Sequence, residues 1–117
     1  MKILGIGVDI IKNKRIKSLL KNKNFIKRTF GKKEVQLSKK ISNKDLYFAK
    51  RFAAKESFAK ALGTGFRNNL NFKDIEILND RIGKPYYFKS MKINNIVRQK
   101  FNIKKYNLFL SISDEKD

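Results

Sequence analysis

The stretch 3-ILGIGVDII-11 decides how the fold is read, because it sorts two kinds of residue by alternation. Successive side chains of a strand point to opposite faces of the sheet. We expect the apolar face to pack into the core; it carries Leu4, Ile6, Val8 and Ile10. The other face carries Gly5, Gly7 and Asp9, and glycines in a strand mark a close approach of another backbone or a ligand. A dinucleotide fingerprint would need a third glycine where Ile10 stands, so the pattern disfavours a phosphate loop.

The composition limits the chemistry more than the fold. Residues 1–117 suffice for one domain with a modest core. The chain has no Cys and no His. This excludes disulfides, thiolate nucleophiles, serine–histidine triads and zinc sites of Cys or His. Any catalysis must use carboxylates, Lys, Tyr, hydroxyls, backbone groups and a hard metal ion, and Mg²⁺ prefers such oxygen ligands. Because no apolar run approaches the roughly 20 residues that span a bilayer and no signal peptide is present, we expect a cytoplasmic protein.

The chain is strongly basic, with 29 Lys and Arg against 10 Asp and Glu and a formal net charge of +19. Such a field attracts nucleic acid, membrane surfaces, polyphosphate cofactors or an acidic protein. The charge alone does not choose among these partners, and most single surface lysines are simply solvated.

The remaining pattern predicts a single α+β domain. Residues 13–29 predict one or two amphipathic helices with a basic outer face, and residues 34–40 a short helix. Residues 43–62 predict the longest helix, apolar on most sides, with Gly63 at its C-terminal cap. Residues 72–88 predict a hairpin whose return strand begins at Pro85, followed by a helix within 89–103 and a strand at 105–113.

Two of the few acidic residues, Asp9 and Glu56, are turned inward by this pattern. Because burial of an ionised carboxylate is costly without a partner, a Mg²⁺ site that bridges strand and helix is one interpretation. In the other, Glu56 pairs with Lys60 one turn later and Asp9 is a strand-end or cap residue. Lys60 likewise contacts a phosphate or is a surface charge. The residues alone leave these alternatives open.

Three blocks of the chain closely resemble the holo-acyl-carrier-protein synthases, the small 4'-phosphopantetheinyl transferases: 5-GIGVDIIKNKRI-16, 48-FAKRFAAKESFAKALGTG-65 and 75-IEILNDRIGKPY-86. The resemblance runs over nearly the whole chain. It implies a small antiparallel sheet packed with helices, and subunits that assemble as homotrimers. It also implies transfer of the phosphopantetheine arm from coenzyme A to a serine of apo acyl carrier protein, for fatty-acid synthesis, with adenosine 3',5'-bisphosphate as the second product.

The resemblance assigns roles to individual residues. Asp9 and Glu56 match the residues that hold Mg²⁺ together with the coenzyme A pyrophosphate, and Lys60 matches the lysine on the phosphates. This agrees with the demand of phosphoryl transfer for charge neutralisation and positioning. We hypothesise that Glu56 or a water on the metal accepts the serine proton. Further positions match contacts of coenzyme A in a cleft shared between subunits: Arg51, Gly63, Gly83, Lys84 and Pro85. The basic positions expected to dock the acidic carrier protein are Arg15, Lys21 and Arg28.

The chain departs from the family pattern near its end. Many members read Ser-x-Ser-His-Glu where this chain reads 111-SISDE-115, so Asp114 replaces the histidine and is a candidate carboxylate near the metal. Members also continue with a further apolar strand segment. Two other functions stay open. One is a small RNA-binding protein, which would bind RNA without Asp9 and Glu56. The other is an inactive member that only binds carrier protein. We expect no membrane partner and no specific nucleic acid.

Overall fold

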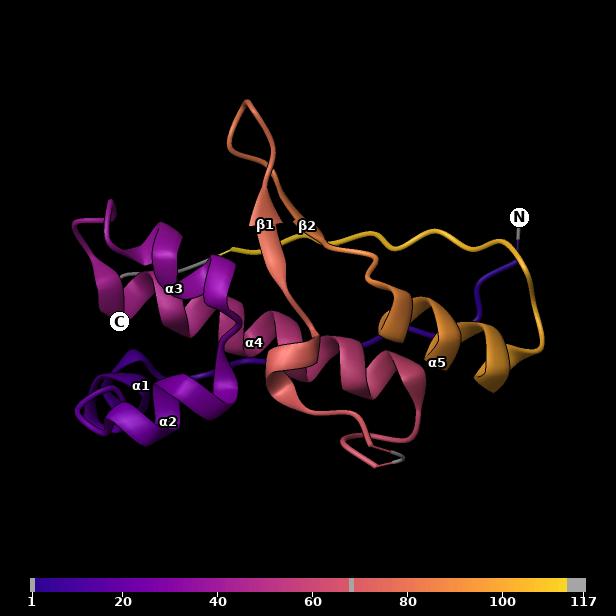
Figure 1. Cartoon of the computed structure of the whole chain (residues 1–117), viewed down its shortest axis with the longest axis horizontal. Helices are drawn as coiled ribbons and strands as arrows, with labels where there is room; N and C mark the ends of the chain where they lie inside the picture. The colour runs from indigo at the N-terminus through magenta and orange to yellow at the C-terminus, as the bar shows by residue number, and fades with distance from the viewer. Residues whose placement is uncertain (1, 68, 114–117) are drawn as a thin grey trace.

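The structure, a computed structural model, describes residues 2–67 and 69–113. Its elements in chain order are α1 (Asn13–Leu19), α2 (Lys23–Thr29), α3 (Lys32–Ser38), α4 (Lys44–Leu62), the 3₁₀ turn η1 (Phe72–Asp74), β1 (Ile77–Asn79), β2 (Pro85–Tyr87) and α5 (Met91–Phe101). Helix α4 runs through the middle, with α1 to α3 near its start, α5 near its end, and the hairpin projecting away (Figure 1). This arrangement confirms the expected single α+β domain.

Helix α4 is the common wall of two apolar clusters. Its start is capped by the Asn43 side chain, which accepts the Leu46 N–H at 3.1 Å, and its end by Gly63 with φ 88°. One cluster joins α4 to the hairpin and α5 and contains Ala54, Phe58, Leu62, Leu70, Ile75, Ile77, Ile93 and Val97. The other joins α4 to α1 and α2 and contains Ile16, Phe25, Phe30, Tyr47, Phe48, Ala49 and Phe52. Burial on most sides of this helix is therefore confirmed.

The predicted hairpin forms, but it is shorter than the alternating pattern. Strands β1 and β2 pair antiparallel, with Asn79 opposite Pro85 at the end near the turn. Residues 72–74 form a 3₁₀ turn, since the Asp74 carboxylate accepts the Asn71 N–H at 2.8 Å. Such a local side-chain bond competes with the strand ladder.

The N-terminal segment corrects one prediction and confirms another. Residues 2–11 are extended but are not assigned to a strand, and the apolar face points outward: Ile6, Val8 and Ile10 are 75%, 71% and 90% exposed. The glycine face packs on α4 instead. A Cβ on Gly7 would lie 1.8 Å from the carbonyl oxygen of Ser57, and one on Gly5 would lie 2.0 Å from that of Ala61. The expected close approach is real, and the partner is a helix backbone.

The C-terminal segment is also extended without a strand partner among the described residues. In residues 105–113 alternate side chains are half-buried and pack on the α5 side of the core, whereas Phe109 is 83% exposed. An open groove of about 1290 Å³ lies between this segment and residues 2–11, and α4 contributes to its lining. No helix in the described ranges is long and apolar enough to cross a membrane.

Candidate functional site

The two glycines of the N-terminal segment lay Asp9 against α4. The Asp9 Oδ1 accepts a hydrogen bond from the Lys60 Nζ at 2.7 Å, and the Val8 carbonyl accepts a second one at 3.1 Å. The Asp9 side chain is 15% exposed, whereas that of Lys60 is 53% exposed. A carboxylate from the first segment and an amino group from the long helix therefore meet at one point.

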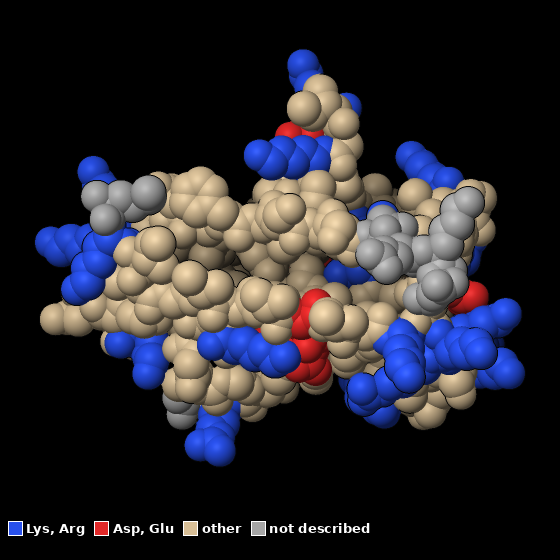
Figure 2. Space-filling view, turned by 180° about the vertical axis from the view of Figure 1, so that it is seen from behind, with Lys and Arg blue, Asp and Glu red and all other residues tan. Residues whose placement is uncertain are grey.

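Glu56 lies one turn before Lys60 and belongs to the same electrostatic cluster. Burial and the negative charge of Asp9 raise the pKa of Glu56, while the positive charges of Lys60 and Arg15 oppose that rise. Acidic side chains gather in the middle of the face seen in Figure 2, with basic side chains on both sides. The two carboxylates thus lie close enough to repel each other, and each gains from a nearby cation.

The alternative in which Glu56 pairs with Lys60 is not what the structure contains. The Lys60 amino group bonds to Asp9 and the Val8 carbonyl, and it influences Glu56 only through its charge. An intrahelical pair four residues apart contributes only a few tenths of a kcal/mol. The contact with Asp9 instead joins the N-terminal segment to α4.

The donor set fits Mg²⁺. Asp9 and Glu56 offer carboxylate oxygens, and no group of three or more His, Cys, Asp or Glu is placed for a metal among residues 2–67 and 69–113. Mg²⁺ commonly takes one or two carboxylates and completes its shell with waters and substrate phosphates. Asp114, the further candidate carboxylate, lies outside the described residues.

A second group of predicted residues surrounds the hairpin. The Arg51 guanidinium is buried, donates through Nη2 to the Asn79 side chain, and lies 3.7 Å from the Tyr47 ring centroid. Asn79 in turn donates to the Gly83 carbonyl at 2.9 Å, and Gly83 takes φ 88° in the turn. Arg51 is therefore tied to the 83–85 turn, where Lys84 is exposed and Pro85 opens β2.

The structure does not bring these two groups together within one chain. Arg51 and Lys60 are nine residues apart on α4, which is two and a half helical turns. They project from opposite sides of the helix, separated by about 14 Å along its axis. Gly63, at the C-terminal cap of α4, belongs to the Lys60 end.

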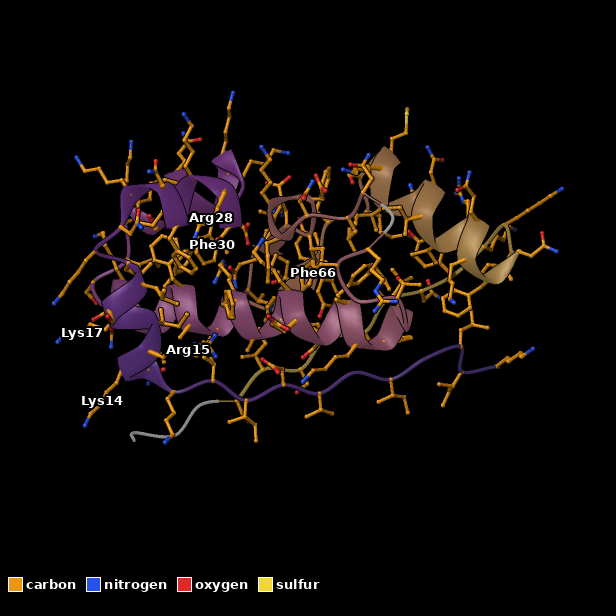
Figure 3. All side chains as sticks on the ribbon, turned by 90° about the horizontal axis from the view of Figure 1, so that it is seen from below. Lys14, Arg15, Lys17, Arg28, Phe30 and Phe66 are labelled. Carbon is orange, nitrogen blue, oxygen red and sulfur yellow. The ribbon has the colours of Figure 1, made fainter. Side chains whose placement is uncertain are left out.

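The basic residues predicted to dock a partner are all exposed, on α1, on α2 and in the turn between them. Arg15 is exposed on α1, Lys21 in the turn after it, and Arg28 on α2, where its guanidinium lies 5.9 Å from the Phe25 ring centroid. Figure 3 shows Lys14, Arg15 and Lys17 projecting from α1 and Arg28 from α2. The charge of Arg15 opposes the rise in the pKa of Glu56, so Arg15 lies near the edge of the carboxylate cluster.

Sequence reasoning missed the most deeply buried ion pair. Glu34 and Lys55 have side chains with 0% exposure and meet at 2.6 Å; the Lys55 Nζ also donates to the Phe72 and Ile75 carbonyls. The Glu34 carboxylate also accepts the N–H groups of Gly31 and Ile77. A glutamate three residues after Gly31 is the spacing of a helix-capping residue, and that signal could have identified Glu34.

Comparisons with known proteins assign this arrangement to a family. The family model for the 4'-phosphopantetheinyl transferase superfamily matches residues 5–110. The holo-[acyl-carrier-protein] synthase of Pelagibacter ubique (strain HTCC1062) is 61% identical over 116 residues, which cover 99% of this chain and 91% of the relative. The chain belongs to the 4'-phosphopantetheinyl transferase superfamily and, within it, to the holo-acyl-carrier-protein synthases.

Solved structures agree with this assignment. The crystal structure of holo-[acyl-carrier-protein] synthase from Neisseria meningitidis is 39% identical, with a TM-score of 0.88 over 99% of this chain and 92% of that chain. The enzyme from Bacillus anthracis strain Ames, described as a complex with CoA (3',5'-ADP), is 42% identical, with a TM-score of 0.68 over 76% of this chain and 77% of that chain. The resemblance inferred from the three sequence blocks is thereby confirmed.

Proposed function

We propose that this chain transfers the 4'-phosphopantetheine group of coenzyme A to a serine of apo acyl carrier protein, using Mg²⁺ held by Asp9 and Glu56. The observation that carries this assignment is the meeting of Asp9, Glu56 and Lys60 beside the glycine face of the first segment. Two carboxylates and an amino group form a site for a divalent cation with a pyrophosphate. Mg²⁺, when bound, neutralises negative charge on the phosphates and orients them.

The residues of the chain supply the rest of the chemistry. Lys60 is half-exposed and long enough to contact the phosphates, where its charge stabilises the developing charge of the transition state. Glu56, or a water on the metal, is proposed to accept the serine proton, since Glu56 lies one turn before Lys60 in the same cluster. Asp9 is fixed by the close packing of Gly5 and Gly7 on α4, so its position is set before any ligand arrives.

We propose further that the complete site is shared between neighbouring subunits of a homotrimer. Arg51 and the 83–85 turn lie on the side of α4 opposite Lys60, which favours a site in which these two groups come from different chains. The Arg51 Nε is buried and has no hydrogen-bond partner among the described residues, which supports an anionic ligand nearby. The outward apolar residues Ile6, Val8, Ile10 and Phe109 support burial against another copy.

The carrier protein is proposed to dock on the surface of Arg15, Lys21 and Arg28. An acidic partner fits this surface because complementary charge raises the rate of encounter and fixes orientation. Arg15 lies beside the carboxylate cluster, so a partner held there presents its serine close to Glu56. The cytoplasmic location expected from the sequence stays a prediction.

The test is intact-mass spectrometry of apo acyl carrier protein incubated with this protein, coenzyme A and Mg²⁺. We expect a mass gain of one phosphopantetheine, which EDTA abolishes and which Asp9→Asn or Glu56→Gln slows roughly hundredfold or more. Asp74→Asn is the matched control, since it removes a carboxylate from a surface pair with Lys92. Absence of any mass gain with folded wild-type protein would favour the inactive, carrier-binding alternative. Binding of RNA that survives loss of Asp9 and Glu56 would favour the RNA-binding alternative.

A further inference from the structure

The Lys60 amino group occupies a carboxylate oxygen that the proposed metal site needs as a ligand. Its Nζ lies 2.7 Å from the Asp9 Oδ1 and also donates to the Val8 carbonyl, so the amino group occupies oxygen ligands suited to a hard cation. Asp9 is mostly covered, whereas the Lys60 side chain is half-exposed and free to swing toward solvent. The protein without ligand thus already has a cation at Asp9, supplied by its own helix.

The local charge balance depends on that cation. Asp9 and Glu56 repel each other, and Lys60 is the cation in hydrogen-bond contact with Asp9. A divalent ion at the two carboxylates would repel the ammonium group and take its ligand. The displaced ammonium would then gain most from an anion beside the metal, and a pyrophosphate is such an anion.

We propose that Lys60 serves as the resident cation of Asp9 in the free protein and is exchanged for the divalent metal when the pyrophosphate arrives. The inference rests on the proposed function for the identity of the pyrophosphate donor. Its consequence is coupling: a metal alone must displace Lys60 without compensation, whereas a metal with coenzyme A gives the ammonium a new partner. By linkage, each ligand must raise the affinity for the other by the same factor.

The first test measures Mn²⁺ binding alone, by the electron paramagnetic resonance signal of free Mn²⁺, without any nucleotide. We expect Lys60→Met to bind Mn²⁺ about tenfold more tightly than wild type, a usual size for coupled sites. Lys60→Arg keeps a cation at Asp9 and should stay weak. The matched control Lys100→Met removes the same charge from an exposed position on α5. The gain must disappear in Asp9→Asn/Lys60→Met. If Lys60→Met binds Mn²⁺ no more tightly than Lys100→Met, the exchange is refuted.

The second test measures the coupling itself. Coenzyme A should tighten Mn²⁺ binding to wild type, after correction for Mn²⁺ held by free coenzyme A, whereas adenosine 3',5'-bisphosphate, which lacks the pyrophosphate, should not. In Lys60→Met the effect of coenzyme A should shrink several-fold. An undiminished effect overturns the proposal.

The two failures are distinguishable. Absence of phosphopantetheine transfer together with the Lys60→Met gain in Mn²⁺ affinity would overturn the proposed function and leave the exchange standing. If wild type transfers phosphopantetheine normally but Lys60→Met shows no gain in Mn²⁺ affinity, the exchange is overturned and the proposed function is kept.

Discussion

Gly7 has no side chain, and this allows the first segment to pack on α4 and to position Asp9. Its backbone lies directly on α4, and an added Cβ would fall 1.8 Å from the Ser57 carbonyl oxygen. We expect Gly7→Ala to push the first segment off the helix and to move Asp9. A displacement near 1 Å can lower activity roughly hundredfold, and kcat/KM for the transfer would measure it. Lys2→Ala, at an exposed position of the same segment, should leave kcat/KM unchanged. Full activity in Gly7→Ala would show that Asp9 is held by other contacts.

Glu56 is expected to weaken the fold that contains it. Its pKa in the folded chain is raised, mainly by burial and then by Asp9. A carboxyl with a raised folded pKa binds its proton more tightly when folded, so stability falls as pH rises from the unfolded value through the folded one. We therefore expect Glu56→Gln to raise the melting temperature at neutral pH in EDTA, with the gain vanishing below about pH 4. A gain that is the same at every pH would contradict this account.

At the scale of elements, the Glu34–Lys55 pair ties α3, α4 and the entry to the hairpin together. Breaking a buried pair leaves an uncompensated charge, whereas replacing both partners by apolar groups is often neutral. We expect Glu34→Ala to lower the free energy of unfolding by about 3–5 kcal/mol, measured by urea titration, and Glu34→Leu/Lys55→Met to lower it by much less.

The matched comparison is the surface pair between Asp74 and Lys92, where the side chains are 16% and 38% exposed. Asp74→Ala should cost less than about 1 kcal/mol beyond the loss of its local cap, because solvent screens the pair. Equal losses at Asp74 and Glu34 would mean that burial does not set the strength of the inner pair.

The elements differ in how far the sequence alone could predict them. Helix α4 was predictable because cap residues and the apolar period agree, and Pro85 located the return strand. The outward orientation of Ile6 and Val8 could not be predicted, because alternation defines the two faces of a segment but not which face packs on the core. The pairing of Lys60 with Asp9 could not be predicted from the sequence pattern either, because it joins residues far apart in the chain. The resemblance supplied the candidate site residues, whose roles stay predictions, and the geometry added their separation into two groups.

For the whole molecule, the net charge of +19 should act mainly on encounter with the carrier protein. Electrostatic attraction raises association rates and is weakened by salt. We expect Arg15→Glu to lower kcat/KM for the carrier protein by about tenfold at low salt, with a smaller effect at 0.5 M salt. Lys39→Glu, an equal charge change after α3, should have little effect on kcat/KM. Equal losses in both variants would assign the attraction to total charge and not to the α1 and α2 surface.

The proposed trimer makes a separate prediction. Ile10 is 90% exposed in the single chain, so Ile10→Lys should leave the monomer fold intact yet weaken assembly if that residue is covered by another copy. Burial of such a side chain is worth about 1.5–3 kcal/mol, so sedimentation should show dissociation at roughly tenfold or more higher protein concentration. Met91→Lys, 80% exposed on α5, is the control. Assembly unaffected by Ile10→Lys would place the contact elsewhere.

The open groove between the two extended segments also affects how the chain behaves before it assembles. An extended backbone without a strand partner can template irregular joining of chains, which is the usual start of aggregation. The 29 basic residues against 10 acidic ones repel another copy of the chain. That repulsion reaches about 8 Å at physiological ionic strength and 3 Å in molar salt. Repulsion between basic residues therefore keeps the unassembled chain from aggregating. Concentrated salt should cause aggregation of this chain before it affects any other property.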